Sequence, residues 1–208
     1  MADICLALDT TGAACTAALV TPSHIIAQRS DDIGRGHAAH LAPLVDDIFK
    51  QARVSPREIS RISVCTGPGS FTGQRVALAF ARGLALPRNI PVLGFSALDV
   101  WAYQSDPQGD RNILTIADVR RNQLCWAYYQ KGVSVRGPQT DDIETAERIF
   151  TTLTPDQIIR DDPISGSVLG WLGLDKTPEN YPARALYSRP PDAKLPGGIM
   201  PPKSTLRV

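Results

Sequence analysis

The chain has 208 residues, a length that suits one large domain or two small lobes with a buried core. Apolar residues make up 43% and charged residues 21%, as in ordinary globular proteins, and the formal net charge is +1. This charge excludes the strongly basic surface of a protein that binds nucleic acid through its own lysines and arginines, so a role in RNA chemistry would need a partner that supplies most phosphate contacts.

Cysteine spacing and the N-terminal sequence predict a reduced, cytoplasmic setting. The four cysteines, Cys5, Cys15, Cys65 and Cys125, form no C-x-x-C pair, and each lies in an apolar run. They are expected to be small buried hydrophobes. No basic segment precedes the first apolar run, and no run approaches the ~20 apolar residues that span a bilayer, so we expect neither a signal peptide nor a membrane partner.

The first 104 residues alternate between strand and helix patterns, and we expect them to form one lobe. Apolar runs bounded by turns predict strands, and apolar residues three and four apart predict helices. The expected elements are strands at 3–9, 14–20, 24–30, 61–66 and 91–94, and helices at 39–52, after Ser55, from the loop at 67–73 to near Pro87, and from Ser96 to Trp101.

A hydrophilic segment at residues 105–112 marks the predicted boundary between domains 1–104 and 105–208. Both halves begin with a strand that ends on an aspartate, followed by a turn and two more strands. This order indicates a degenerate internal repeat, although chance is an alternative. The second lobe is expected to be smaller, with a proline-rich tail that is extended or irregular. Its expected elements are strands at 113–118, 123–129 and 133–136, a helix at 144–153, and at most a short strand at 167–169.

The loop at residues 67–75, Gly-Pro-Gly-Ser-Phe-Thr-Gly-Gln-Arg, joins a strand to a helix. Backbone N–H groups and the helix dipole at such a junction favour anions. No Gly-Lys-Ser/Thr closes the loop as in a Walker A motif, and Thr72 stands where G-x-G-x-x-G has its third glycine. A tight turn into a closely packed helix explains the glycines equally well. The candidate nucleotide-binding residues are Gly67, Gly69, Ser70, Thr72 and Gly73.

Asp9, Thr10 and Thr11 form a second candidate segment for a nucleotide. An acid at a strand end beside hydroxyl residues can hold hydrated magnesium and a phosphate. The simpler interpretation is a turn in which Asp9 accepts hydrogen bonds from local N–H groups. Asp118 is its counterpart in the second half, but arginines follow it there, so we expect a salt-bridged turn and an incomplete phosphate clamp.

Catalytic and metal-binding patterns are weak. His37 and His40 are three residues apart, and His24 is the only other histidine, whereas a metal site needs three or four ligands. We expect capping or interface contacts from these histidines. The sequence shows no G-x-S-x-G elbow and no convincing nucleophile–base pair.

Several of these segments together resemble the TsaB (YeaZ) family. The loop at 67–75 is the most specific match. The others are Leu8-Asp9-Thr10-Thr11, His37 with the helix at 41–46, Gly83-Leu84-Ala85, residues 94–98, residues 118–120 with Gln123, and the late segment 186–196. The resemblance covers nearly the whole chain, densely to about residue 101 and sparsely after it.

The resemblance implies an α/β fold of the actin, sugar-kinase and Hsp70 class (ASKHA, ribonuclease H-like), with two lobes of mixed sheets flanked by helices. It implies a non-catalytic scaffold or activating subunit of a tRNA-modifying complex. Such a subunit pairs with a TsaD-like catalytic subunit and a TsaE-like ATPase to install threonylcarbamoyl on the tRNA adenosine next to the anticodon. The family is related to TsaD, whose metal motif, a histidine pair in a longer helix, has no match here.

The resemblance also bears on cofactors and assembly. It implies no cofactor on the chain alone, and ATP or ADP with magnesium in the complex. The tRNA would be bound mainly through the complex, and the chain alone would form a homodimer.

The predicted helix at 37–52 is where we expect the partner to bind, because its apolar stripe is longer than a thin two-layer domain needs to bury. A TsaD-like subunit or a second copy of the chain would pack on it. The expected interface residues are His37, Leu41, Leu44, Val45, Ile48, Ala52 and, from the following helix, Arg75.

Two other functions stay open. Asp9 to Thr11 and the glycine loop fit a small-molecule kinase or ATPase of the same fold, although the short second lobe argues against a closed cleft with its own adenosine pocket. His37 and His40 leave a glycoprotease-like metallopeptidase as the least favoured alternative.

Overall fold

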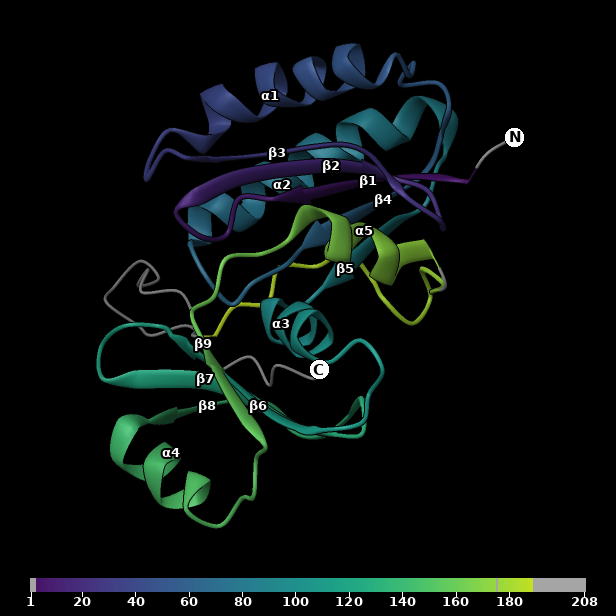
Figure 1. Cartoon of the computed structure of the whole chain (residues 1–208). Coiled ribbons are helices and arrows are strands. Elements are labelled where there is room, and N and C mark those ends of the chain that lie inside the picture. Colours follow the sequence, from purple (N-terminus) through teal and green to yellow (C-terminus); the bar gives the residue numbers. More distant parts are fainter. Residues whose placement is uncertain (1–2, 175, 189–208) are drawn as a thin grey trace, which may run out of the picture.

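The computed structural model describes residues 3–174 and 176–188. Two β-sheets lie one above the other, with helices outside and between them (Figure 1). The layers are α1 and α2, the first sheet, α5 and α3, the second sheet, and α4. The late part of the family-like segment, at 189–196, and the tail beyond Ser188 lie outside the described residues.

The first sheet has five strands in the order β3-β2-β1-β4-β5. β1, β2 and β3 are antiparallel neighbours, and β4 and β5 run parallel to β1. The apolar stripes of α1 and α2 cover one face and form a core cluster with the sheet. The elements are β1 (Ile4–Asp9), β2 (Ala14–Val20), β3 (Ile25–Asp32), α1 (His37–Ala52), β4 (Ile59–Cys65), α2 (Phe71–Ala85), a 3₁₀ turn (Leu86–Arg88) and β5 (Val92–Phe95).

The second sheet has the order β8-β7-β6-β9, which repeats the β3-β2-β1-β4 order of the first. A helix again precedes the strand that is parallel to the first one, so the predicted internal repeat is confirmed. The boundary near residue 105 stays a prediction. The elements are α3 (Ala97–Ser105), β6 (Asn112–Asp118), β7 (Gln123–Gln130), β8 (Val133–Asp142), α4 (Ile143–Phe150), β9 (Gln157–Arg160) and α5 (Gly166–Leu174).

Two sequence predictions were wrong. The segment after Ser55 is a turn and no helix, because β4 begins at Ile59 and leaves only three residues, too few for a helix. The expected short strand at 167–169 lies inside the helix α5. This helix is apolar on all sides and rich in glycine, so its sequence has no helical periodicity to detect.

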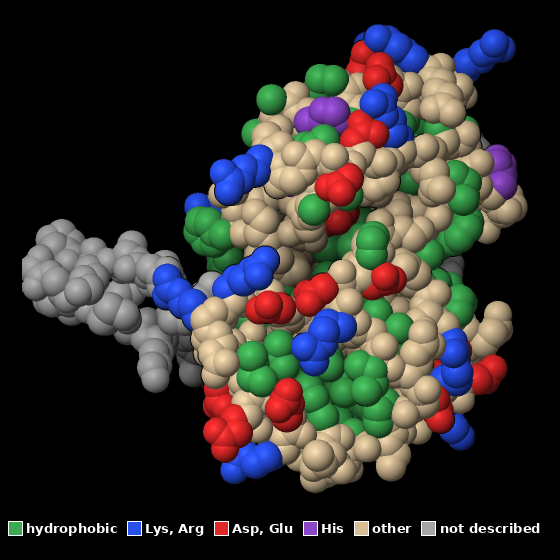
Figure 2. Space-filling model, turned by 60° about the vertical axis from the view of Figure 1, so that its left-hand side comes forward, with side chains coloured by type: hydrophobic (Ala, Val, Ile, Leu, Met, Phe, Trp, Pro, Cys, Tyr) green, Lys and Arg blue, Asp and Glu red, His purple; other side chains and the backbone are tan. Residues whose placement is uncertain are grey.

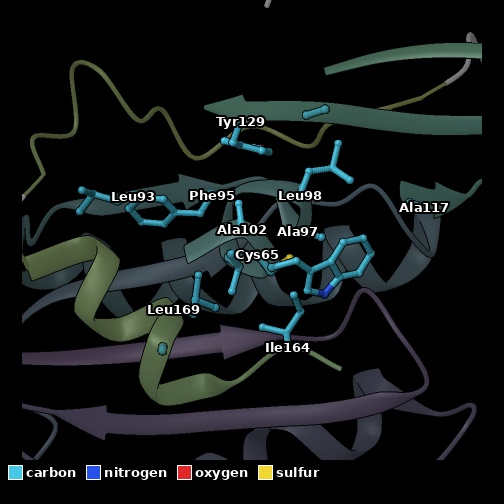
Figure 3. Packing of buried hydrophobic residues seen from close by; sticks show 14 of the residues in the cluster. Cys65, Leu93, Phe95, Ala97, Leu98, Ala102, Ala117, Tyr129, Ile164 and Leu169 are labelled. Atoms are coloured by element: carbon cyan, nitrogen blue, oxygen red, sulfur yellow. The ribbon is translucent and has the colours of Figure 1, made fainter. Parts of the chain in front are cut away.

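The layer between the sheets is an apolar core to which both halves contribute. Side chains from β5, α3, β7 and α5 point toward one another there (Figure 3). Hydrogen bonds join the same layer: the Tyr129 hydroxyl donates to Asp99 Oδ1 at 2.6 Å, and Trp101 Nε1 donates to the Asp162 carbonyl at 2.6 Å. The two lobes are therefore packed directly on each other.

All four cysteines are buried and free, as the sequence predicts. Burial raises the pKa of the Cys5 thiol to about 11 and drives that of Cys65 well above its ordinary value, which makes both thiolates unfavourable. Within the described residues, none of the helices combines the length and the apolar composition needed to cross a membrane.

Candidate functional site

Asp9 lies at the carboxyl end of β1 and is 3% exposed. Its Oδ1 accepts two hydrogen bonds from Thr11, one from the N–H at 2.9 Å and one from the hydroxyl at 2.7 Å. Burial raises the pKa of the Asp9 carboxyl, against the lowering effect of these hydrogen bonds. A carboxyl in this setting fits poorly as a direct magnesium ligand, because it is buried and one of its oxygens already accepts two hydrogen bonds.

The glycine loop packs against this same turn, so the two candidate segments come together. The Ser70 N–H donates to the Thr11 carbonyl at 2.8 Å, and the Thr10 hydroxyl donates to the Gly73 carbonyl at 2.6 Å. A Cβ at Gly69 would lie 2.5 Å from the Thr11 carbonyl oxygen, and one at Gly73 would overlap the Thr10 carbonyl. Close approach of two backbones therefore accounts for these glycines.

The start of α2 is capped from within the chain. Ser70 is its N-cap, and the Ser70 hydroxyl accepts a hydrogen bond from the Gly73 N–H at 3.1 Å. One of the donors that an anion would use at a helix start is thus occupied. The interpretation as a tight turn into a packed helix describes this loop better than a phosphate nest.

A cleft of about 1260 Å³ opens between the two lobes. Asp118 at the end of β6, the two residues after it and the segment after β9 form its second wall. The expectation that the short second lobe leaves no closed cleft with its own adenosine pocket stays a prediction. Of the eight candidate nucleotide residues, Asp9, Thr11, Gly69 and Ser70 line it. Thr10, Gly67 and Gly73 are buried in the packing below, and Thr72 faces a different groove.

The second-lobe turn shares one hydrogen bond with the first but differs in backbone and side chains, because Arg120, Arg121 and Asn122 have positive φ angles of 66°, 55° and 59°. Asp118 Oδ1 accepts a hydrogen bond from the Arg120 N–H at 2.7 Å, just as Asp9 accepts one from Thr11. The Arg120 guanidinium lies 3.8 Å from Asp118 Oδ2, so the predicted salt-bridged turn is confirmed.

The charged side chains that line the cleft are mainly acidic. Five aspartates line it, against one arginine, Arg120. Figure 2 shows acidic side chains gathered across the middle of one face, with basic ones beside them. An acidic lining repels a polyphosphate unless cations accompany it. The lining aspartates are Asp9, Asp32, Asp118, Asp161 and Asp162.

The apolar stripe of α1 was expected to bind a partner, and the structure corrects this interpretation. Leu41, Leu44, Val45 and Ile48 are each at most 3% exposed and belong to the core on the first sheet. The five-stranded sheet buries Leu44, Val45 and Ile48, so these side chains are not available at a surface, and Leu41 only borders the outer groove of α1 and α2. His37 is also buried, Ala52 is half-buried and Arg75 is exposed.

The outer sides of α1 and α2 nevertheless form a separate surface groove of about 380 Å³. Small exposed residues, Ala38 on α1 and Ala79 on α2, lie along it. At Gly83 on the same helix a Cβ would meet nothing within 4 Å, so the helix backbone is accessible there. The remaining lining residues are Leu41, Thr72, Arg75, Val76 and Phe80.

The two histidines of α1 do not share a site. His40 Nε2 lies 2.7 Å from Asp31 Oδ2 at the surface, whereas His37 is buried and its Nε2 has no hydrogen-bond partner among the described residues. In residues 3–174 and 176–188 no group of three or more His, Cys, Asp or Glu side chains is placed to hold one metal ion.

The structure adds cleft residues that the sequence interpretation passed over. Phe71, Gln74 and Tyr187 line the cleft beside the glycine loop. Phe71 could have been noticed as an aromatic residue in an otherwise small and polar loop. Tyr187 lies more than one hundred residues away in sequence, and only packing brings it here.

Comparison with known proteins identifies the family. The model of the TsaD family, described as tRNA N6-adenosine threonylcarbamoyltransferase, matches residues 25–159, which is more than half of the chain. The chain belongs to the TsaD family. TsaB (YeaZ) proteins are among its homologues: the Escherichia coli tRNA threonylcarbamoyladenosine biosynthesis protein TsaB is 34% identical over 127 residues, or 61% of this chain.

Other relatives extend the comparison to nearly the whole chain. An uncharacterized Mycobacterium leprae protein is 31% identical over 205 residues, or 92% of this chain. The chain spans only 56% of that relative's length and 54% of the Escherichia coli TsaB. The solved structure of YeaZ from Pseudomonas aeruginosa superposes with a TM-score of 0.71 at 24% identity, covering 89% of this chain and 99% of that chain. The predicted α/β fold with mixed sheets flanked by helices is confirmed.

Proposed function

We propose that this TsaD-family chain is the non-catalytic partner subunit of a complex that installs threonylcarbamoyl on the tRNA adenosine next to the anticodon. It would bind a TsaD-like catalytic subunit through the outer groove between α1 and α2. The observation that carries the proposal is this groove: it is separate from the cleft, and small residues on two adjacent helices leave their backbones open to close approach. Helices of a related subunit can pack tightly on such a face.

The geometry of the cleft supports a non-catalytic role. The Asp9 carboxyl is buried and accepts a hydrogen bond from the Thr11 hydroxyl. In the turn of the second lobe, Arg120 occupies a position where a phosphate site would need a hydroxyl residue. We therefore assign no cofactor to the chain alone, and ATP or ADP with magnesium to the assembled complex. The proposal also includes a TsaE-like ATPase as a further partner and tRNA that is held mainly by the other subunits. It further includes a homodimer of the isolated chain and a cytoplasmic location.

Co-purification with a TsaD-like subunit tests the proposed interface. Ala79→Arg places a large charged side chain in the groove at an exposed position, so the fold should be retained while the partner is excluded. The wild type should co-purify and should restore threonylcarbamoyladenosine in tRNA of cells that lack TsaB. The variant should fail in both assays.

Val133→Arg provides a matched control, because Val133 is 64% exposed on β8, far from this groove. The control should behave as the wild type. An intact complex with Ala79→Arg would contradict the proposed docking face, and failure of the wild type to restore the modification would contradict the proposed function.

A small-molecule kinase or ATPase is the second candidate, and the size of the cleft favours it. Both the Asp9 turn and the Asp118 turn line this cleft of about 1260 Å³, which is the place where a nucleotide would lie between lobes. Calorimetry of the isolated chain with Mg-ATP separates the two functions. Tight binding with turnover would favour the kinase, and absence of binding would favour the partner subunit.

A further inference from the structure

Arg75 lies between the outer groove of α1 and α2 and the interlobe cleft. Its side chain is exposed and lines the outer groove. Its guanidinium lies 3.7 Å from the ring centroid of Phe71 and 5.7 Å from that of Tyr187. Both of these aromatic residues line the cleft. Arg75 therefore belongs to the proposed docking face and also contacts the cleft lining.

Two interactions join Arg75 to the aromatic pair of Phe71 and Tyr187, whose ring centroids are 5.1 Å apart. Arg75 and Phe71 are one helical turn apart on α2, so the helix itself sets the spacing between cation and ring. The Arg75 Nε also donates a hydrogen bond to the Tyr187 hydroxyl at 3.0 Å. In the isolated chain Arg75 is exposed, so water competes for the guanidinium and both interactions are weak.

Tyr187 lies near the end of a segment that reaches the cleft from the far side of the first sheet. After α5 this segment runs past β5 (yellow in Figure 1). The Leu186 N–H then donates to the Thr66 carbonyl at 2.8 Å, and Tyr187 and Ser188 follow in the cleft lining. The hydrogen bond from Arg75 thus joins the partner-facing helix α2 to this segment.

We propose that Arg75 couples partner binding in the outer groove to the order of the cleft lining formed by Phe71 and Tyr187. A subunit that covers the groove removes water from the Arg75 guanidinium. Cation–π interactions and hydrogen bonds strengthen when water is excluded, so Arg75 holds the aromatic pair more firmly and the segment that ends at Ser188 opens less often. This inference rests on the proposed function and adds a regulatory consequence to the same docking face.

The coupling is reciprocal, as binding equilibria require. Partner binding that orders the aromatic pair must be strengthened by any change in the cleft that orders the same pair. Arg75 is a positioning residue in this scheme, because it acts through Phe71 and Tyr187.

Hydrogen exchange of the full chain, alone and with a saturating TsaD-like subunit, tests the coupling. The reporter is the amide of Leu186, next to Tyr187. In the wild type, partner binding should slow its exchange at least about 5-fold, because the segment opens less often. Arg75→Met keeps an unbranched apolar side chain and removes the guanidinium, so the Leu186 amide should exchange equally with and without the partner. Slowed exchange of α1 and α2 amides shows that the variant has bound the partner.

Arg82→Met is the matched control. Arg82 lies further along α2, and its Nη2 donates to the Ala183 carbonyl of the same segment at 2.6 Å, but it does not line the outer groove. This variant should keep the slower exchange on partner binding.

Two outcomes would overturn the coupling and leave the proposed function intact. One is unchanged Leu186 exchange in a wild-type complex. The other is full slowing in Arg75→Met, which would mean that the partner protects the segment directly. Absence of any complex with the wild type would contradict the proposed function itself, and the coupling with it.

Discussion

Two glycines on α2, Gly73 and Gly83, have different surroundings and therefore different roles. Gly73 faces the Asp9 turn, where a Cβ would overlap the Thr10 carbonyl, whereas Gly83 faces open space. The first glycine is needed for packing within the chain, whereas the second has no such role in the isolated chain and adds conformational freedom to the unfolded state.

This difference predicts opposite signs for the same substitution. Gly73→Ala should lower the free energy of unfolding by ~1–3 kcal/mol, because α2 must move away from the turn. Gly83→Ala should raise it by ~0.5–1 kcal/mol. Urea denaturation measures both, and equal effects at the two sites would show that the loop does not pack as described.

Asp99 links the lobes and makes stability depend on pH. Burial raises the pKa of its carboxyl above the ordinary 3.8, although hydrogen bonds from the Tyr129 hydroxyl and the Ser96 backbone oppose this. In the interval above 3.8 the folded chain retains a proton that the unfolded chain has released. The contribution of Asp99 to stability is therefore complete below that value and is lost as the pH rises through the raised pKa.

Asp99→Asn should reduce this pH dependence, because an amide does not ionise and its oxygen can still accept from Tyr129. The unfolding free energy of the wild type minus that of the variant should fall as the pH rises from about 4 toward neutrality. Urea titrations at several pH values give this difference. A difference that stays constant, or rises, would contradict the burial of an ionisable Asp99.

Among the elements, α5 is the one that returns from the second half of the chain to the first sheet. Three glycines on it allow the helix to lie against β2 and β4: a Cβ at Gly170 would be 2.6 Å from Val20 Cγ2, and one at Gly173 would overlap the Ser63 hydroxyl. The Trp171 Nε1 donates to the Thr21 carbonyl at 3.0 Å, and this hydrogen bond also holds α5 against the first sheet.

Gly170→Ala should therefore destabilise the fold by ~1–3 kcal/mol, despite the higher helix propensity of alanine. Hydrogen exchange should show faster exchange of α5 amides, since the helix must lift from the sheet. Gly83→Ala serves as the control for propensity. Greater stability of Gly170→Ala would mean that α5 packs less closely than the structure shows.

At the scale of the whole molecule, the layer of α3 and α5 makes the two sheets parts of one packed unit (Figure 3). We expect a single cooperative unfolding transition. Trp126 lies in the second lobe, where its ring centroid is 5.2 Å from that of Phe150 in an edge-on arrangement, so its fluorescence reports on that lobe. Far-UV circular dichroism reports on both lobes. Coincident transitions are expected, and separate midpoints would show that the lobes unfold independently.

Local patterns in the sequence determined most of the elements and their order. Runs of apolar residues predict β1, β2 and β6, and the spacing of Leu41, Leu44 and Ile48 predicts α1, because strand and helix periods are properties of consecutive residues. The strand–aspartate–turn order likewise predicts the repeat between the halves. α5 escaped detection because a helix buried on all sides has no polar face.

Only the tertiary structure decided what these elements face. The α1 stripe could have met a partner or the chain's own sheet, and the width of the first sheet buries Leu44 and Ile48 within the chain. The meeting of Asp9 with the glycine loop, and of Phe71 with Tyr187, joins segments far apart in sequence. Such pairings depend on how the layers pack, and periodicity carries no information about them.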